Sequence, residues 1–182
     1  MTDAIPSARR QELLDAAYRY VLTNGAADLS LRPLAASTGT SPRVLLYLFG
    51  SKDGLVREIL RRARDEQREL VRAVLLERPA DRDAVDRLWG WLSAPERRDT
   101  IRLFIEAFAR SLHPEPGPWE GFAQTSVEEW LELLDELEPS PSPDRTLRLA
   151  VLRGLLLDLL ATGDVDRITR AYRLHRHAMA SS

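Results

Sequence analysis

The sequence predicts an all-α protein of about nine helices, with a small three-helix domain over residues 1–54 and a larger helical bundle over residues 55–182. Three observations support this fold class. Apolar residues recur at helical spacing along most of the chain, residues that cap or end helices separate these stretches, and no stretch shows the alternation typical of a strand. With 182 residues, 44% of them hydrophobic, the chain is also long enough to bury a core.

The first helix is expected over residues 8–24, after a short tail. Gly25 follows and ends it, because glycine reaches the left-handed conformation at little cost. The apolar stripe of this helix consists of Leu13, Leu14, Ala17, Tyr18 and Val21.

The next stretch, residues 29–55, has the spacing of a helix-turn-helix. Ser30 is a good N-cap for a helix whose first turn holds Pro33, and Gly39 ends this helix. Ser41 is a second N-cap with Pro42 at the first helical position, so about three residues remain for the turn. The second helix is therefore expected over residues 42–49.

The two helices of this motif divide into an inner and an outer face. Leu34, Leu45 and Leu48 can face inward, and a small residue at Ala35 lets the helices cross closely. Arg43 and Tyr47, four residues apart, share the outer face. In a helix-turn-helix this outer face enters the major groove of DNA.

A third helix is expected to begin after Ser51, with Lys52 in its first turn. A cation there opposes the helix dipole by about 0.3–1 kcal/mol unless an anion such as a phosphate lies in front of it. We therefore expect phosphate contacts from Lys52 and Tyr47, and Arg43 can pair with guanine. The residues placed to contact base edges are Thr40, Ser41, Pro42 and Arg43. The alternative is a helical hairpin with a solvated polar face.

The remaining helices follow from proline breaks and capping residues. A long helix over residues 55–78, which contain no Gly or Pro, would link the two domains mechanically. Asp81 can cap a short helix, and Ser93 with Glu96 forms a capping box that opens another. Further helices are expected over residues 119–137 and 144–162 and from residue 165, separated by proline-rich or glycine breaks. The helix over residues 144–162 is apolar over too wide an arc for one core-facing stripe, so part of its surface needs another partner.

The first 60 residues resemble the TetR-type family of bacterial transcriptional regulators. The matching residues are, in order, Arg10-Gln-Glu-Leu-Leu-Asp-Ala-Ala, Asn24-Gly25, Leu29-Ser30-Leu31-Arg32, Leu34-Ala35, Gly39-Thr40-Ser41 and Phe49-Gly50-Ser51-Lys52-Asp53-Gly54-Leu55. There is one departure, because Leu46 stands where the family usually has Tyr, and Tyr47 comes one residue later. The resemblance implies that Arg32 can also reach DNA. It implies the same for Arg9 and Arg10 in the N-terminal tail, which are otherwise simply solvated.

The resemblance also implies a function for the helical bundle. It implies a homodimeric, ligand-released repressor that binds a palindromic operator in double-stranded DNA. A pocket for a small apolar or aromatic effector would use Trp89, Phe104, Phe108, Trp119, Phe122 and Trp130, although aromatic residues at helical spacing can equally be core residues. The dimer interface would use Leu152, Leu156, Leu159, Ile168 and Tyr172, although these residues can equally form the core of one protomer.

Composition limits the other classes of function. The formal net charge is −2, yet residues 29–72 hold nine basic and five acidic side chains, which suits local contact with phosphates. No cysteine, Glu-x-x-His motif or phosphate-binding glycine loop is present, so no metal, cofactor or enzymatic activity is expected, and the acidic run over residues 128–138 is interpreted as a solvated face. No apolar run is long enough for a membrane span, so a soluble, cytoplasmic protein is expected. Two alternatives remain: an all-helical carrier or enzyme with the N-terminal helices as scaffold, and a regulator that contacts another protein instead of an effector.

Overall fold

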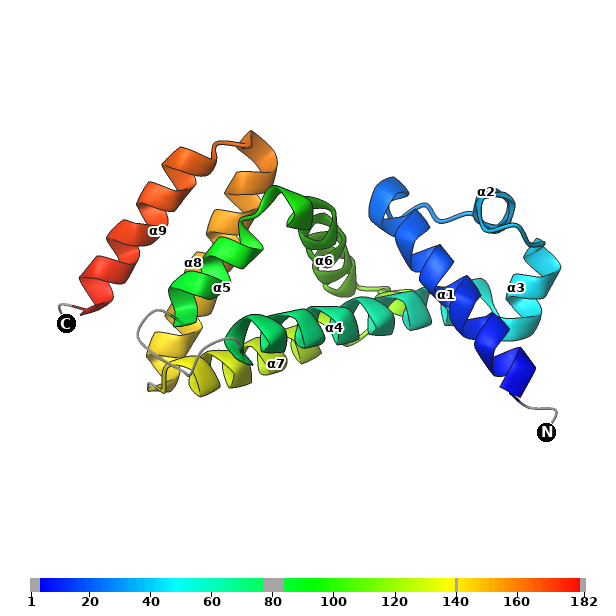
Figure 1. Cartoon of the computed structure of the whole chain (residues 1–182), viewed down its shortest axis with the longest axis horizontal. Helices are drawn as coiled ribbons and strands as arrows, with labels where there is room; N and C mark the ends of the chain where they lie inside the picture. The colour runs from blue at the N-terminus through cyan, green and yellow to red at the C-terminus, as the bar shows by residue number, and fades with distance from the viewer. Residues whose placement is uncertain (1–3, 77–83, 140, 181–182) are drawn as a thin grey trace. The chain divides into compact units, whose positions relative to one another are not determined.

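The computed structural model describes residues 4–76, 84–139 and 141–180. Within these residues every regular element is helical, which confirms the all-α fold class, and the helices are labelled in Figure 1. The elements are α1 (Ala4–Asn24), α2 (Leu31–Ser37), α3 (Pro42–Phe49), α4 (Lys52–Leu76), α5 (Ala84–Leu92), η1 (Pro95–Arg97), α6 (Arg98–Ser111), η2 (Gly117–Trp119), α7 (Phe122–Leu137), α8 (Ser142–Thr162) and α9 (Val165–Ala180).

The helix boundaries differ from the expected ones at several places. Helix α1 begins four residues before residue 8, because Pro6 falls in the first turn, where a missing backbone N–H removes no intrahelical bond. The long helix expected after the Ser51 cap is α4, which starts at Lys52, and Gly54 in its first turn does not interrupt it. The expected end of this helix at residue 78 and the cap at Asp81 lie outside the described residues.

The expected capping box before α6 does not form. The Ser93 hydroxyl donates to the carbonyl oxygen of Gly90 (3.4 Å), and a short 3-10 helix, η1, begins at Pro95 and leads into α6. The prediction was wrong because the N-cap position falls on Ala94, one residue later, with Pro95 as the first helical residue. Trp119 likewise lies in the separate element η2, so α7 begins three residues later than expected.

The chain forms two compact units. The first, here called the head unit, comprises Met1–Leu70 and Arg102–Ala123, and the second, the body unit, comprises Val71–Ile101 and Gln124–Ser182. The core of the head unit joins residues from α1 to α4 with residues far along the sequence. These distant core residues are Leu103 and Ala107 of α6, Trp119 of η2 and Phe122 of α7.

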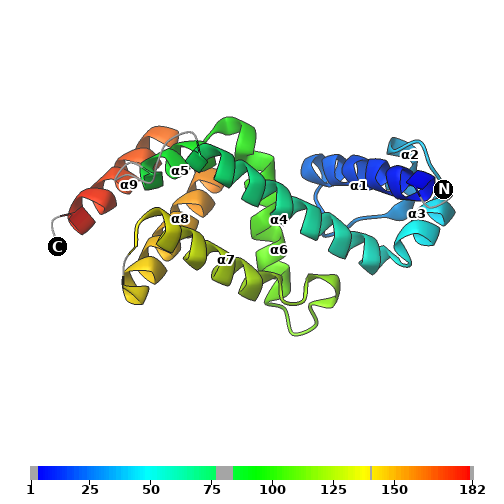
Figure 2. The same ribbon diagram turned by 60° about the horizontal axis from the view of Figure 1, so that its bottom comes forward.

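In the body unit, α8 and α9 pack as an antiparallel pair joined at Gly163, which has a left-handed φ of 69°. Figure 2 shows the same pair from a second direction. The Trp89 ring stacks on the Tyr172 ring, with centroids 4.7 Å apart. The Tyr172 hydroxyl donates to Asp86 (2.6 Å), and burial and this hydrogen bond both raise the pKa of that hydroxyl. This contact ties α9 to α5.

Candidate nucleic-acid interface

The turn between α2 and α3 is closed by hydrogen bonds between backbone groups. The Thr40 amide donates to the Ala35 carbonyl oxygen (2.9 Å) and the Gly39 amide to that of Ala36 (3.4 Å). This is the pattern of a Schellman motif, which needs a left-handed residue after the helix. Gly39 supplies it, with a φ of 63°. The turn therefore ends α2 as the sequence predicted and sets the crossing of the two helices.

Helix α3 begins as expected and buries one side. The Ser41 hydroxyl accepts from the Val44 amide (3.3 Å), which confirms Ser41 as N-cap, and Leu45 is buried. Ser30 occupies the N-cap position of α2, but its hydroxyl caps nothing, so that detail of the prediction was wrong.

The other side of α3 is open. Tyr47 is 85% exposed and Arg43 is exposed beside it. Two apolar residues flank them, Val44 at 39% and Leu46 at 40% exposure. The surface is thus one cation and one aromatic ring between two apolar edges.

The junction between α3 and α4 is tight. The Ser51 hydroxyl accepts from the Gly54 amide (2.9 Å) and caps α4. A Cβ atom on Gly54 would collide with the carbonyl oxygen of Phe49, so only glycine fits at this position. This close approach fixes Lys52, in the first turn of α4, relative to α3.

Arg10 braces the head unit. Its guanidinium lies 5.0 Å from the centroid of the Phe49 ring, pairs with Glu58 (3.2 Å) and donates to the Leu48 carbonyl oxygen (3.4 Å). Arg10 thus links α1, α3 and α4, while Arg9 pairs with Glu12 on α1 (3.1 Å). The sequence suggested that these two arginines either contact DNA or are solvated, and neither expectation anticipated these contacts within the protein. Sequence reasoning missed the contacts of Arg10 because they join residues distant along the chain.

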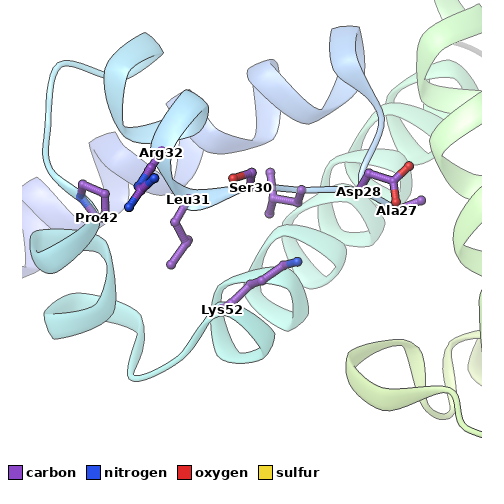
Figure 3. A pocket seen from close by; sticks show the side chains of 8 residues that line it. Ala27, Asp28, Ser30, Leu31, Arg32, Pro42 and Lys52 are labelled. Carbon is purple, nitrogen blue, oxygen red and sulfur yellow. The ribbon is translucent and has the colours of Figure 1, made fainter.

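An open groove of about 630 Å³ lies between the start of α2 and the start of α4. Figure 3 shows Lys52 extending from α4 toward the segment before α2, and Arg32 beside Pro42. Within the described part of the chain, no ion pair engages Arg32, Arg43 or Lys52. Seven residues were expected to contact DNA, and all lie on α2, the turn, α3 or the first turn of α4: Arg32, Thr40, Ser41, Pro42, Arg43, Tyr47 and Lys52. Three of them, Arg32, Pro42 and Lys52, line the groove.

The six aromatic residues expected in an effector pocket are divided between the units. Phe104, Phe108, Trp119 and Phe122 belong to the head unit, and Trp89 and Trp130 to the body unit. Trp119 and Phe122 are buried in the head core, and Phe104 packs edge-on against Phe122 with centroids 5.3 Å apart. One small cavity in the body unit, of about 10 Å³, is lined by Leu92, Ser93, Ala94, Arg98, Ile101, Leu156, Leu159 and Leu160. It has space for no more than a water molecule.

The five residues expected at a dimer interface lie inside the protomer. Leu152, Leu156, Leu159, Ile168 and Tyr172 are all buried, so their side chains pack within the body unit and do not form an outer surface. The exposed side of α8 is apolar as well, and its residues are Leu147, Ala150, Gly154, Leu157 and Ala161. Both faces of this helix are apolar, and the sequence alone selected the inward one.

Two further observations concern other functions. Among the described residues, no three His, Asp or Glu side chains come together as metal ligands. None of the described helices combines the length and apolar character needed to cross a membrane.

A short turn between two crossing helices, with an open face carrying unpaired cations, is typical of helix-turn-helix transcriptional regulators. Comparison with known proteins supports this class. Residues 13–59 match the sequence model of the bacterial regulatory proteins of the tetR family. The HTH-type transcriptional regulator BetI of Brucella anthropi is 28% identical over 169 residues, which is 82% of this chain and 78% of that protein. BetI of Rhizobium meliloti is 28% identical over 122 residues, and the match spans 60% of its length.

Solved structures agree. The multidrug binding protein EbrR, solved with imidazole, is 27% identical and has a TM-score of 0.67, with 90% of this chain and 87% of that chain covered. A putative transcriptional regulator from Rhodococcus sp. RHA1 shares the fold with a TM-score of 0.72 at 16% identity, over 92% of this chain and 95% of that one. Over residues 13–59 the chain is thus similar to the tetR family of bacterial regulatory proteins, and over most of its length it is similar to transcriptional regulators.

Proposed function

We propose that the protein is a homodimeric repressor that binds a palindromic operator and is released by a small effector. Residues 1–54 read the DNA, and residues 55–182 bind the effector and hold two copies together. The observation that carries the proposal is the open face of α3, where Arg43 and Tyr47 are exposed, together with the exposed Lys52 in the first turn of α4. A protein acting on the chromosome works in the cytoplasm.

Base contacts come from the first turn of α3 and the turn before it. Arg43 pairs with the O6 and N7 atoms of a guanine, and the exposed methyl groups of Val44 contact the C5-methyl group of a neighbouring thymine. Thr40, Ser41 and Pro42 approach the same base edges. Arg32, Tyr47 and Lys52 bind phosphates and fix the register of the helix on the duplex, with Tyr47 acting in place of the tyrosine that Leu46 replaces.

The dimer forms through the outer faces of α8 and α9. Exposed apolar residues recur on α8 at intervals of three and four residues, and on α9 at Ala171, Leu174 and Ala178. Such spacing places them in one seam along each helix, as in helix bundles. Alanine and glycine in the seam allow close approach of a second copy. A two-fold axis through this bundle presents two copies of α3 to the DNA, about 34–36 Å apart, which matches one helical turn.

The effector is a small, largely apolar or aromatic molecule. EbrR, which is 26% identical in these complexes, was solved with proflavin and with malachite green, and these aromatic ligands support the same ligand class here. The candidate contacts are the six aromatic residues, Trp89, Phe104, Phe108, Trp119, Phe122 and Trp130. Since the cavity of the body unit holds about 10 Å³, binding there requires side chains to move apart. An effector releases the operator only if it binds the conformation that cannot bind DNA more tightly than the conformation that binds DNA.

A selection of binding sequences from random duplex DNA tests the reading function. Arg43→Ala should lower discrimination at one base pair by about 1–3 kcal/mol. Lys52→Ala should weaken binding to every sequence and reduce the slope of its salt dependence by about one. Arg173→Ala, which removes an exposed arginine from α9, serves as the control and should change neither. The reverse pattern would refute these roles, and no selected sequence at all would favour a carrier with a scaffold head.

Titration with proflavin tests the effector site. Quenching of tryptophan fluorescence and release of the selected operator should occur over the same concentration range. Trp130→Ala and Phe104→Ala should each weaken proflavin binding. Equal binding by both variants would remove these aromatic residues from the site.

A further inference from the structure

One carboxylate of α6 binds the turn that joins α1 to α2. Glu106 Oε1 accepts from the Ala27 amide (2.6 Å) and Oε2 accepts from the Ala26 amide (3.2 Å). The donors and the acceptor lie 79 and 80 positions apart in sequence, yet all belong to the head unit. Glu106 was not among the residues to which the sequence assigned a role.

The backbone of the turn explains why it takes a carboxylate. Gly25 has a left-handed φ of 81°, and its amide still bonds to Val21 of α1 (2.8 Å). Successive amides after a left-handed residue converge and form a small anion-binding concavity. The carboxylate also lies near the carbonyl end of α1, whose dipole repels it. Its two hydrogen bonds must therefore outweigh this repulsion.

Helix α6 holds the carboxylate in place. Leu103 and Ala107, on either side of Glu106 in sequence, are 3% and 0% exposed and pack in the head core. The Glu106 side chain therefore starts from a fixed backbone. The position of α6 and the conformation of the turn are linked through one residue.

The turn between α1 and α2 also shapes the groove next to α3. Ala27 is the first residue of the segment, continuing to Arg32, that lines this groove together with Pro42 and Lys52. A shift of Ala27 thus moves the wall that carries Arg32 relative to Lys52. Two cations that bind neighbouring phosphates depend on this separation.

We infer that Glu106 is a positioning residue for DNA reading. It fixes the Ala26 and Ala27 amides, and through them the entry into α2 and the separation of Arg32 from Lys52 across the groove. Glu106 does not itself touch DNA. The inference rests on the proposed function, because it concerns how the same interface is held.

Glu106→Gln in the full-length protein tests the inference. Glutamine has the same size, but its amide NH₂ group would face one of the two backbone amides, so at least one hydrogen bond is lost. Hydrogen bonds to charged groups are worth enough to give about a tenfold effect. Circular dichroism first identifies conditions in which each variant is fully folded. Three quantities are then measured under these conditions: amide exchange at Ala26 and Ala27 by NMR, affinity for a selected operator, and affinity for an unrelated duplex of equal length.

The expected result is exchange at both amides that is about ten times faster and affinity about ten times weaker for both duplexes, because Arg32 and Lys52 contact phosphates whatever the sequence. Glu120→Gln, which neutralises an exposed acid in the same unit, should behave as wild type. Faster exchange with unchanged affinity for both duplexes would reduce Glu106 to a structural role and overturn the inference. Unchanged exchange would overturn it too, since the hydrogen bonds would not be holding the turn.

A second variant covers the case in which Glu106→Gln does not fold. Gly25→Ala keeps the carboxylate but places a Cβ at a φ of 81°, a conformation that alanine adopts only with strain. It should weaken binding to both duplexes, and unchanged affinities for both would overturn the inference. A wild-type protein that selects no sequence would instead refute the proposed function, and with it this role of Glu106.

Discussion

Contact between Val44 and a thymine methyl group can be tested from each side of the interface. The first change is Val44→Ala in the protein, and the second is replacement of each operator thymine in turn by deoxyuridine, which lacks only the C5-methyl group. Val44 is 39% exposed on α3, so its truncation leaves the head core unchanged. The two changes therefore act on the interface alone.

The size of the effect follows from the area that the contact buries. Removing one buried methyl group costs about 0.8 kcal/mol, which is about a fourfold loss in affinity. At a single thymine of each half-site, deoxyuridine should weaken binding by wild type about fourfold and binding by Val44→Ala hardly at all. That thymine should lie next to the guanine that Arg43 recognises. Fluorescence anisotropy at fixed salt measures all four affinities of the cycle.

Val165→Ala provides the matched control. Val165 has nearly the same exposure, 38%, but lies at the start of α9 in the body unit. This variant should keep the full response to deoxyuridine. If every thymine position gives the same loss with Val44→Ala as with wild type, Val44 does not contact a thymine methyl group and the assignment is refuted.

Three further predictions concern the body unit. Leu157→Glu should give monomers on a sizing column, because Leu157 is 54% exposed and lies in the proposed seam. The control Leu112→Glu, at a residue 68% exposed outside the seam, should leave the dimer intact. A Leu157→Glu protein that remains dimeric would place the interface elsewhere. Tyr172→Phe removes the hydroxyl that donates to Asp86 and should lower the free energy of unfolding in urea by about 1–2 kcal/mol; no change would show that the bond is not stabilising. Burial and nearby guanidinium groups lower the pKa of His175, so the unfolded chain binds its proton first and stability should fall as pH drops below about 6.5. His175→Gln should flatten that part of the stability profile, and an unaltered slope would exclude His175 as its cause.

The helix-turn-helix could be predicted because local chemistry determines it. Gly39, Ser41 and Pro42 act within a few residues of their own position, and the structure has the left-handed turn, the cap and the first helical residue where the sequence placed them. Signals of this kind need no knowledge of the rest of the chain. The roles of the exposed residues toward DNA stay predictions.

Other features depended on contacts that no local pattern reveals. The sequence marked Ser93 as a cap, yet its hydroxyl bonds to the preceding turn. Arg10 and Glu106 act on segments far along the chain. On α8, Leu156 and Leu157 are equally apolar neighbours, and only packing of the body unit decides that the first is buried and the second exposed.

The head unit is discontinuous in sequence, since its core takes Leu103, Ala107, Trp119 and Phe122 from beyond position 100. A fragment cut after residue 70 would lose these four side chains and expose the apolar surface that they cover. Recombination between regulators of this fold would then preserve a working reader only if residues 102–123 travelled with the N-terminus. Designed chimaeras that exchange operator specificity face the same constraint. They must exchange residues 102–123 together with the N-terminal segment, so a single crossover point is not enough.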